Sequence, residues 1–210
     1  IYPTLGDLYI KSKNYNKAVE YLEITLDKKY KRSFKTRLTF ILAQLYHIKG
    51  NNKASYYYQK VVESNPEYEM AFQAKINRAL SFSEGDSKAI RMQLMKMLKD
   101  DKNKEFLDVI YFGLAELSNR QNKIKEAIPL YELSVSTSVK NDAQKALSSV
   151  ILADIYYDKQ NYRPAQAYYD TAVAFMNSQN QRFKNAQQKQ LTLTELISNL
   201  DIIENQDSLR

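Results

Sequence analysis

Few residues of this chain have the types and spacing that catalysis or metal binding would need. The chain has a single histidine, His47, and no cysteine, so neither a thiolate site nor a histidine pair can hold a metal. The acidic pair Asp100 and Asp101 lies in the polar stretch KDDKNK, which is typical of a solvated loop. There is no glycine-rich loop to cradle a phosphate. The sequence therefore predicts a protein that is not an enzyme and has no cofactor or metal.

Binding chemistry is suggested most clearly by the basic run KKYKRSFKTR, from Lys28 to Arg37, which holds six Lys or Arg and two aromatic residues. Such a run is usually a solvated loop between helices. Its basic side chains are also a candidate docking patch for an anionic partner: Lys28, Lys29, Lys31, Arg32, Lys35 and Arg37. A helical-repeat RNA-binding protein or another adaptor that uses this loop is thus the alternative function. Nucleic acid is disfavoured, because 31 basic residues are interleaved with 24 acidic ones.

The elements that position these residues are predicted to be helices. The chain of 210 residues contains only four Gly and four Pro, while Leu, Ala, Lys, Glu and Gln are plentiful, a balance that favours helices over strands. Hydrophobic residues make up 44% of the chain, enough to bury a sizeable core. We expect an all-α protein.

One sequence pattern recurs five times along the chain. LGDLYIKSKNYNKAVEYLEITL, from Leu5, returns in altered form as LADIYYDKQNYRPAQAYYDTAV, from Leu152. The copies start near residues 5, 42, 78, 114 and 152, so successive starts lie 36 to 38 residues apart. A regular period of this length is typical of a solenoid built from one supersecondary unit.

Each copy is predicted to form a helical hairpin. In the fifth copy, Leu152, Ala153 and Tyr156 share one helical face, a polar break follows at Asn161, and a second helical period begins at Ala165. The unit resembles the tetratricopeptide repeat, whose small-residue, Tyr, Ala and aromatic signature is present in four of the five copies. The third copy departs most. The hairpins are expected to stack into an α-solenoid in the form of a right-handed superhelix.

The repeat pattern ends near Phe175, and a different helical pattern follows. Apolar residues recur at helical intervals from Ala186 to about Glu204, which predicts a helix that caps the last hairpin. We therefore divide the chain into a solenoid over residues 1–178 and a capping helix with a frayed tail over residues 179–210. The chain opens with Ile1 inside the first periodic segment, so we expect it to be a piece excised from a longer protein.

The first helix of each repeat is predicted to contribute a row of side chains to a partner-binding groove. Residues three before, one after and four after the signature small residue fall on one helical face. In repeats two, four and five these residues are Phe40, Gln44, His47, Phe112, Glu116, Asn119, Val150, Asp154 and Tyr157, and in the third repeat the last is Ser83. The resemblance to tetratricopeptide proteins implies that this face lines a concave groove that receives peptides or partner segments. The alternative is an empty groove, with partners on other surfaces.

The second half of the chain, over residues 66 to 210, resembles the tetratricopeptide lipoproteins of the gliding-motility and type IX secretion machinery, which are SprE/PorW-like. The segments that carry the resemblance are Met97–Leu117, Tyr131–Val173 and Gln206–Leu209. The resemblance implies a scaffold that binds subunits of the secretion apparatus. It also implies that the longer parent protein is held by an N-terminal lipid at the periplasmic face of the outer membrane. Lipidation would require a cysteine near the start of the parent protein and this chain contains none, so the resemblance places the anchor outside this chain. No run in the chain reaches the roughly 18 apolar residues of a spanning helix.

Overall fold

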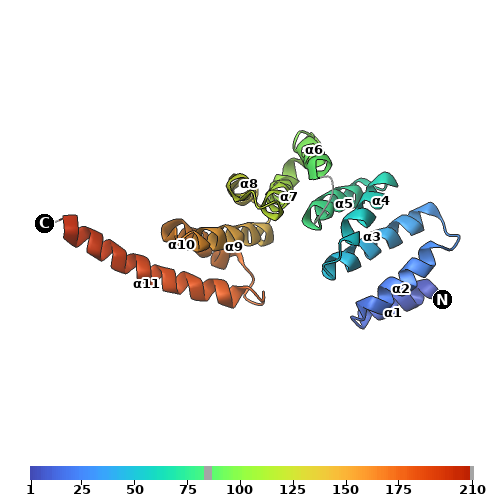
Figure 1. Ribbon diagram of the computed structural model, residues 1–210, viewed down its shortest axis with the longest axis horizontal. Coiled ribbons are helices and arrows are strands. Elements are labelled where there is room, and N and C mark those ends of the chain that lie inside the picture. Colours follow the sequence, from blue (N-terminus) through green and yellow to red (C-terminus); the bar gives the residue numbers. More distant parts are fainter. Residues whose placement is uncertain (83–86, 209–210) are drawn as a thin grey trace. The chain divides into compact units, whose positions relative to one another are not determined.

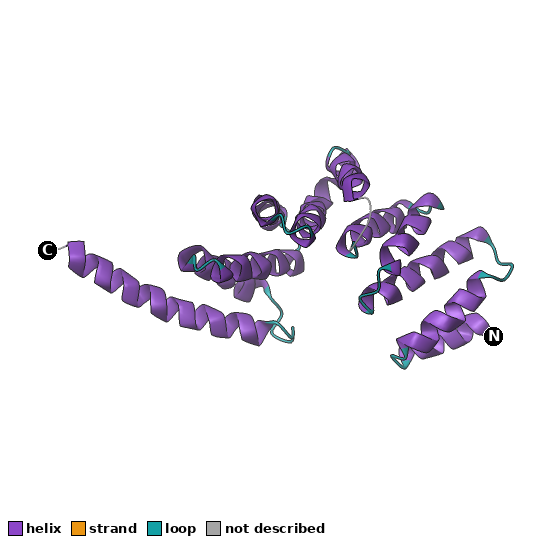
Figure 2. Cartoon of the chain, viewed as in Figure 1, coloured by secondary structure: helices purple, strands orange, loops and turns teal. Residues whose placement is uncertain are grey.

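The computed structural model of the chain describes residues 1–82 and 87–208, and every regular element in these two ranges is a helix (Figures 1 and 2). The elements are, in chain order, α1 (Tyr2–Lys11), α2 (Tyr15–Leu26), α3 (Arg32–Ile48), α4 (Lys53–Glu63), α5 (Tyr68–Leu80), α6 (Ser87–Leu98), the 3₁₀ helix η1 (Asp101–Phe106), α7 (Leu107–Arg120), α8 (Ile124–Thr137), α9 (Asp142–Asp158), α10 (Tyr162–Phe175) and α11 (Phe183–Ser208). The predicted all-α fold is confirmed. Ser83, Leu209 and Arg210, to which the sequence predictions extend, lie outside the described residues.

The helices of the described chain pair as hairpins, one for each copy of the repeat. The pairs are α1 with α2, α3 with α4, α5 with α6, α7 with α8, and α9 with α10. The degenerate third copy, which lacks the Ala-aromatic pattern, also forms a helix pair. The helix α11 follows the last pair and packs against α10. The five predicted hairpins and the terminal helix are thus confirmed.

Contacts divide the chain into two compact units. The first unit comprises Ile1–Asp100 with Arg120–Asn122, and the second comprises Asp101–Asn119 with Lys123–Arg210. The division into a solenoid and a cap at residue 178 stays a prediction.

The turn inside a hairpin has the same backbone conformation in four of the repeats. One residue of each turn has a positive φ, between 57° and 62°: Lys13, Gly50, Asn122 and Gln160. The N–H of the next residue donates at 2.9 Å to a carbonyl five residues earlier, as from Asn14 to Tyr9 and from Asn161 to Tyr156. This is the Schellman arrangement, which satisfies carbonyl groups at the end of the first helix. In these four copies the polar break therefore encodes a tight left-handed turn.

Small residues lie where helices approach one another most closely. Alanines at the repeat positions of the first and second helices are all 0% exposed: Ala43, Ala79, Ala115 and Ala153, and Ala18, Ala54, Ala127 and Ala165. In the first repeat, Gly6 takes the place of the first-helix alanine. A Cβ at Gly6 would lie 2.8 Å from Cδ2 of Leu22 on α2. Side chains larger than Ala thus have little room at these positions.

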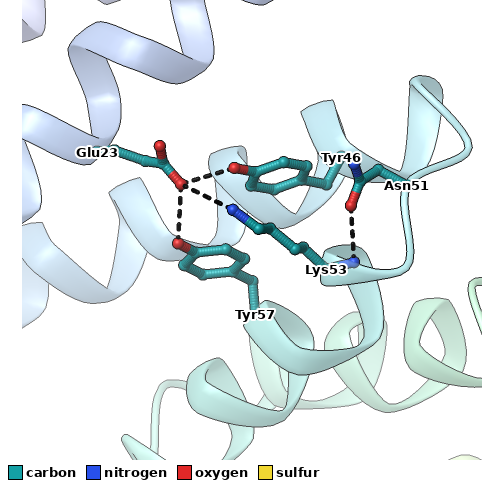
Figure 3. Close-up of polar contacts among 5 residues, drawn as sticks. All are labelled: Glu23, Tyr46, Asn51, Lys53 and Tyr57. Atoms are coloured by element: carbon teal, nitrogen blue, oxygen red, sulfur yellow. Dashed lines mark hydrogen bonds and ion pairs between the residues drawn. The ribbon is translucent and has the colours of Figure 1, made fainter.

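A carboxylate on one hairpin holds two tyrosines of the next. Glu23 Oε1, on α2, accepts hydrogen bonds from Tyr46 on α3 at 2.6 Å and from Tyr57 on α4 at 3.1 Å (Figure 3). The two rings stack with centroids 5.3 Å apart and planes 9° from parallel. Lys53 Nζ lies 4.0 Å from the same carboxylate oxygen. The contact ties the first hairpin to both helices of the second.

The same arrangement recurs in the second unit. Glu132 Oε1, on α8, accepts from Tyr156 on α9 at 3.1 Å and from Tyr168 on α10 at 3.4 Å. The rings stack with centroids 5.8 Å apart and planes 1° from parallel. Glu23 and Glu132 occupy the same position relative to the starts of their repeats at residues 5 and 114. The clamp therefore recurs at the same repeat position in the first and fourth hairpins.

A buried aspartate, which sequence reasoning missed, anchors the connection between α8 and α9. Asp108, near the start of α7, is only 3% exposed. Its side chain accepts from Ser138 at 3.1 Å, from the Asn141 amide at 3.0 Å and from the N–H of Val109 at 2.8 Å. Its backbone carbonyl accepts from Ser134 at 2.8 Å. These bonds stabilise a buried carboxylate and fix the path of the chain from the fourth hairpin to the fifth.

The terminal helix is longer than the sequence predicted. It begins at Phe183 rather than Ala186, and it continues to Ser208 instead of fraying after Glu204. Ala186 and Leu193 belong to the core of the fifth hairpin, and Ile197 is also buried. Arg163 on α10 pairs with Asp201 at 2.7 Å and with Glu204 at 2.9 Å, and these ion pairs favour the helical conformation in the last turns.

Enlarging a small residue in a helix contact should destabilise the fold. Ala165→Leu places a larger side chain at a position that is 0% exposed, so the free energy of unfolding should fall by about 1–3 kcal/mol. The matched control is Ala167→Leu, on the same helix but exposed, which should change it little. Urea unfolding followed by circular dichroism measures both. Equal stabilities of the two variants would show that Ala165 does not mark a close contact.

Candidate partner-binding site

In the first unit, the predicted groove row forms a partly exposed strip on α3. Gln44 is exposed, whereas Phe40 and His47 are half-buried. Both rings meet the buried Tyr58 ring of α4 edge-on, with centroid distances of 5.9 Å for Phe40 and 6.2 Å for His47. We call Phe40, Gln44 and His47 the α3 strip. It presents the Gln44 amide between two aromatic rings that pack against Tyr58.

His47 contributes a neutral ring to this strip. Burial, and secondarily the positive charge of Arg120, lower the pKa of His47 below its usual range. The imidazole is therefore uncharged at neutral pH and offers one donor and one acceptor.

On α7, the predicted row is largely used for packing. Phe112 is only 6% exposed and packs edge-on against Tyr131 of α8, with centroids 5.9 Å apart. Glu116 accepts a short hydrogen bond from the hydroxyl of Tyr131. Asn119 is half-buried. The second helix of the same hairpin thus packs against the Phe112 ring, and a contact of Phe112 with a partner stays a prediction.

On α9, two residues of the predicted row contact Lys189 of the terminal helix, and the third is buried. Val150 is 5% exposed and belongs to the core of the fifth hairpin. Asp154 accepts from the hydroxyl of Tyr169 and from Lys189 Nζ of α11, the latter at 2.7 Å. The same ammonium lies 5.1 Å from the centroid of the Tyr157 ring. Asp154 and Tyr157 therefore bind a lysine of this chain.

The tyrosines of the carboxylate clamps are held in the neutral form. Burial is the main cause, and the negative charge of the adjacent carboxylate adds to it. Together these effects raise the pKa of Tyr57 beside Glu23, and that of Tyr168 beside Glu132, to about 12. The clamps are thus structural contacts that require a proton on each phenol.

The structure separates the six residues of the predicted basic patch. Lys28 lies over the Tyr2 ring, 6.0 Å from its centroid, and Lys31 is the exposed N-cap residue of α3. The other four line two adjoining hollows at the start of α3: Lys29, Arg32, Lys35 and Arg37. The basic run is therefore part of a concave surface as well as a connection between helices.

Residues outside the run, Lys60 and Met70 among them, complete this surface, which we call the basic cleft. Lys60 of α4 lines the first hollow, of about 450 Å³, with Lys29, Arg32 and Lys35. Met70 of α5 lines the second, of about 720 Å³, together with Arg37. Sequence reasoning missed both additions. A hairpin places the end of its second helix beside the start of its first, and this geometry is the signal that could have identified Lys60.

The described residues, 1–82 and 87–208, also bear on metal binding and on membrane insertion. No group of three or more His, Asp or Glu side chains in these ranges is arranged to hold a metal ion. Within the same ranges, no helix combines the length and apolar character needed to cross a bilayer.

The arrangement defines a protein of tandem helical hairpins. The family model described as the tetratricopeptide repeat matches residues 1–23 and 146–175, which fall on α1 with α2 and on α9 with α10. The first and fifth hairpins are therefore the parts of the chain that match the tetratricopeptide repeat. A search of curated proteins found no match.

Two solved structures resemble the chain. One is described as the functional characterization of pilF from Pseudomonas aeruginosa; it is 18% identical, with 95% of this chain and 90% of that chain covered and a TM-score of 0.55. The other is BtubC (BKLC) from P. vanneervenii, which is 17% identical, with 96% and 78% covered and a TM-score of 0.40. The first of these likenesses supports the fold.

Reversing the charge of Asp154 should weaken the packing of α11. Asp154→Lys removes the acceptor of Tyr169 and faces Lys189 with a like charge, so we expect the free energy of unfolding to fall by about 1–2 kcal/mol. The double variant Asp154→Lys with Lys189→Glu should recover part of this loss, because the opposite charges are restored. Urea titration measures each variant. Unchanged stability of the single variant would contradict the assigned contact.

Stability should fall in alkaline solution because of the tyrosine clamps. The folded state raises the pKa of Tyr57 and Tyr168 from about 10 in the unfolded chain to about 12. Their contribution is therefore complete below about pH 10 and is lost as the pH rises towards 12. Thermal melting between pH 8 and about 11.5 should show a shallower decline for Tyr57→Phe with Tyr168→Phe than for the original chain. Parallel curves would contradict this origin.

Proposed function

We propose that this protein is a non-catalytic scaffold that binds other proteins through its helical hairpins. Tetratricopeptide repeats generally mediate contacts between proteins, and two segments of the chain match that repeat. The observation that carries the proposal is the α3 strip, where exposed Gln44 stands between Phe40 and His47. Aromatic groups beside a hydrogen-bonding side chain are characteristic of protein interfaces.

The scaffold acts, in this proposal, as an assembly or accessory component of the type IX secretion and gliding-motility machinery. The support is the resemblance carried by Met97–Leu117 and Tyr131–Val173. These segments contain Asp108 and the serines and asparagine that bind it, so the resemblance covers residues with a specific structural task. The proposed partners are subunits of the secretion apparatus. The proposed place of action is the periplasmic face of the outer membrane, reached through a lipid anchor outside this chain.

Photo-crosslinking should identify the partner at the α3 strip. A photo-reactive residue at Gln44 of the full-length protein, in the cells that produce it, is expected to capture subunits of the secretion apparatus, because this position is exposed within the strip. The matched control carries the same residue at Tyr56, which is 56% exposed on α4 but outside the strip. Mass spectrometry identifies the products. Equal capture at both positions, or recovery of RNA instead of protein, would contradict the proposal.

A further inference from the structure

We propose that the basic cleft of the first unit is a docking site for an acidic peptide segment that carries one large apolar side chain. The proposal rests on the proposed scaffold function and names the chemistry of one partner. It concerns a surface separate from the α3 strip, formed by the connection before α3, the first turns of α3, and the ends of the neighbouring helices α4 and α5.

The charge of the first hollow favours an anionic ligand. Four cationic side chains line it: Lys29, Arg32, Lys35 and Lys60. The remaining described residues of its lining are Tyr and Thr or Ser, with no carboxylate among them. Charges of one sign gathered in a concave surface focus the field and attract the opposite charge. Carboxylates entering here would meet ammonium, guanidinium and hydroxyl donors together.

Two of the cations are held in place by the protein. Arg32 donates from Nη2 to the carbonyl of Ser64 at 2.8 Å, and Lys35 donates from Nζ to the carbonyl of Leu26 at 2.6 Å. Each contact satisfies a carbonyl at a helix end. An arginine has five N–H donors and a lysine has three, so both keep donors for a ligand. Because the side chains are already ordered, binding costs less conformational entropy.

The second hollow supplies an apolar wall. It adjoins the first hollow through Arg32, Thr36 and Ser64, which line both. Phe34 and Met70 lie on its wall, and both pack against the hydrophobic core of the first unit. A methionine beside an aromatic ring accommodates large apolar side chains of varied shape. A ligand that fills both hollows must therefore carry anionic and apolar groups a short distance apart.

A peptide fits this surface better than a nucleic acid does. The second hollow has a carboxylate, Glu67, on its wall, which repels any anionic group there, so the phosphates that a nucleic acid carries at every residue fit it less well than an apolar side chain of a peptide does. Phe34 is half-buried and meets Tyr30 at a tilt of 49°. Bases stack on open aromatic faces, and this pair does not present parallel faces to them.

Fluorescence anisotropy with a defined probe tests the proposal. The probe is a fluorescein-labelled peptide of Glu and Asp with one central Phe, titrated with the 210-residue chain. The variant Lys29→Glu with Arg37→Glu should weaken binding at least about tenfold, since one substitution lies in each hollow. Both side chains are exposed, so the fold should be retained, as circular dichroism will verify. The matched control, Lys125→Glu with Lys140→Glu, makes the same charge change at exposed sites outside the cleft and should leave affinity nearly unchanged.

Two further probes examine the ligand chemistry. Replacing the Phe of the peptide by Ser should weaken binding several-fold, because the apolar wall then loses its contact. A labelled oligouridylate should bind more weakly than the peptide. Equal affinity for the Phe and Ser peptides, equal loss in both charge variants, or tighter binding of the RNA would overturn the proposal.

The outcomes separate this site from the scaffold function. If the peptide binds as expected while crosslinking at Gln44 captures no secretion subunit, the basic cleft stands and the proposed secretion role fails. If crosslinking succeeds but the acidic peptide does not bind, the scaffold role stands and the basic cleft has no such ligand.

Discussion

Close approach of helices at small side chains is the constraint on which the structure depends. A single hairpin cannot bury its apolar face, so each must pack against its neighbours. Fully buried alanines such as Ala43 on α3 and Ala54 on α4 let the backbones come near enough for this. The left-handed turns at Lys13, Gly50 and Gln160 bring the paired helices together at the same point in these repeats. Large tyrosines then fill the space around the alanine contacts.

The tyrosines explain why so many carboxylates in this chain are structural. Glu23 and Glu132 each hold two phenols from the next hairpin. Glu116 and Asp154 each accept from a buried tyrosine of their own hairpin. The acidic residues of the groove row, Glu116 and Asp154, are therefore already engaged in hydrogen bonds within the protein. This division leaves the α3 strip, where the corresponding position is Gln44, as the part of the row most available for binding.

Neighbouring helices turn the basic run from a polar connection into part of a concave surface. Along the chain it is a polar connection, and two of its cations do satisfy helix ends, as Arg32 does at Ser64 and Lys35 at Leu26. The fold adds Lys60 from α4 and an apolar wall from α5. A stretch of like charge thereby becomes a concave surface with two kinds of chemistry.

The sequence by itself determined the helical class, the five hairpins and the buried alanines, because a helical period and a repeat period are local properties that any stacking of the units preserves. It could not assign the exposure and contacts of individual side chains. Val150 and Phe112 have the spacing of groove residues, yet both are buried, and Asp154 binds Lys189, which lies 35 residues away along the chain. Asp108 shows no pattern in the sequence, because its partners come from the far end of α8 and the following loop. These outcomes belong to the tertiary structure, since exposure and hydrogen bonding depend on which helix lies alongside.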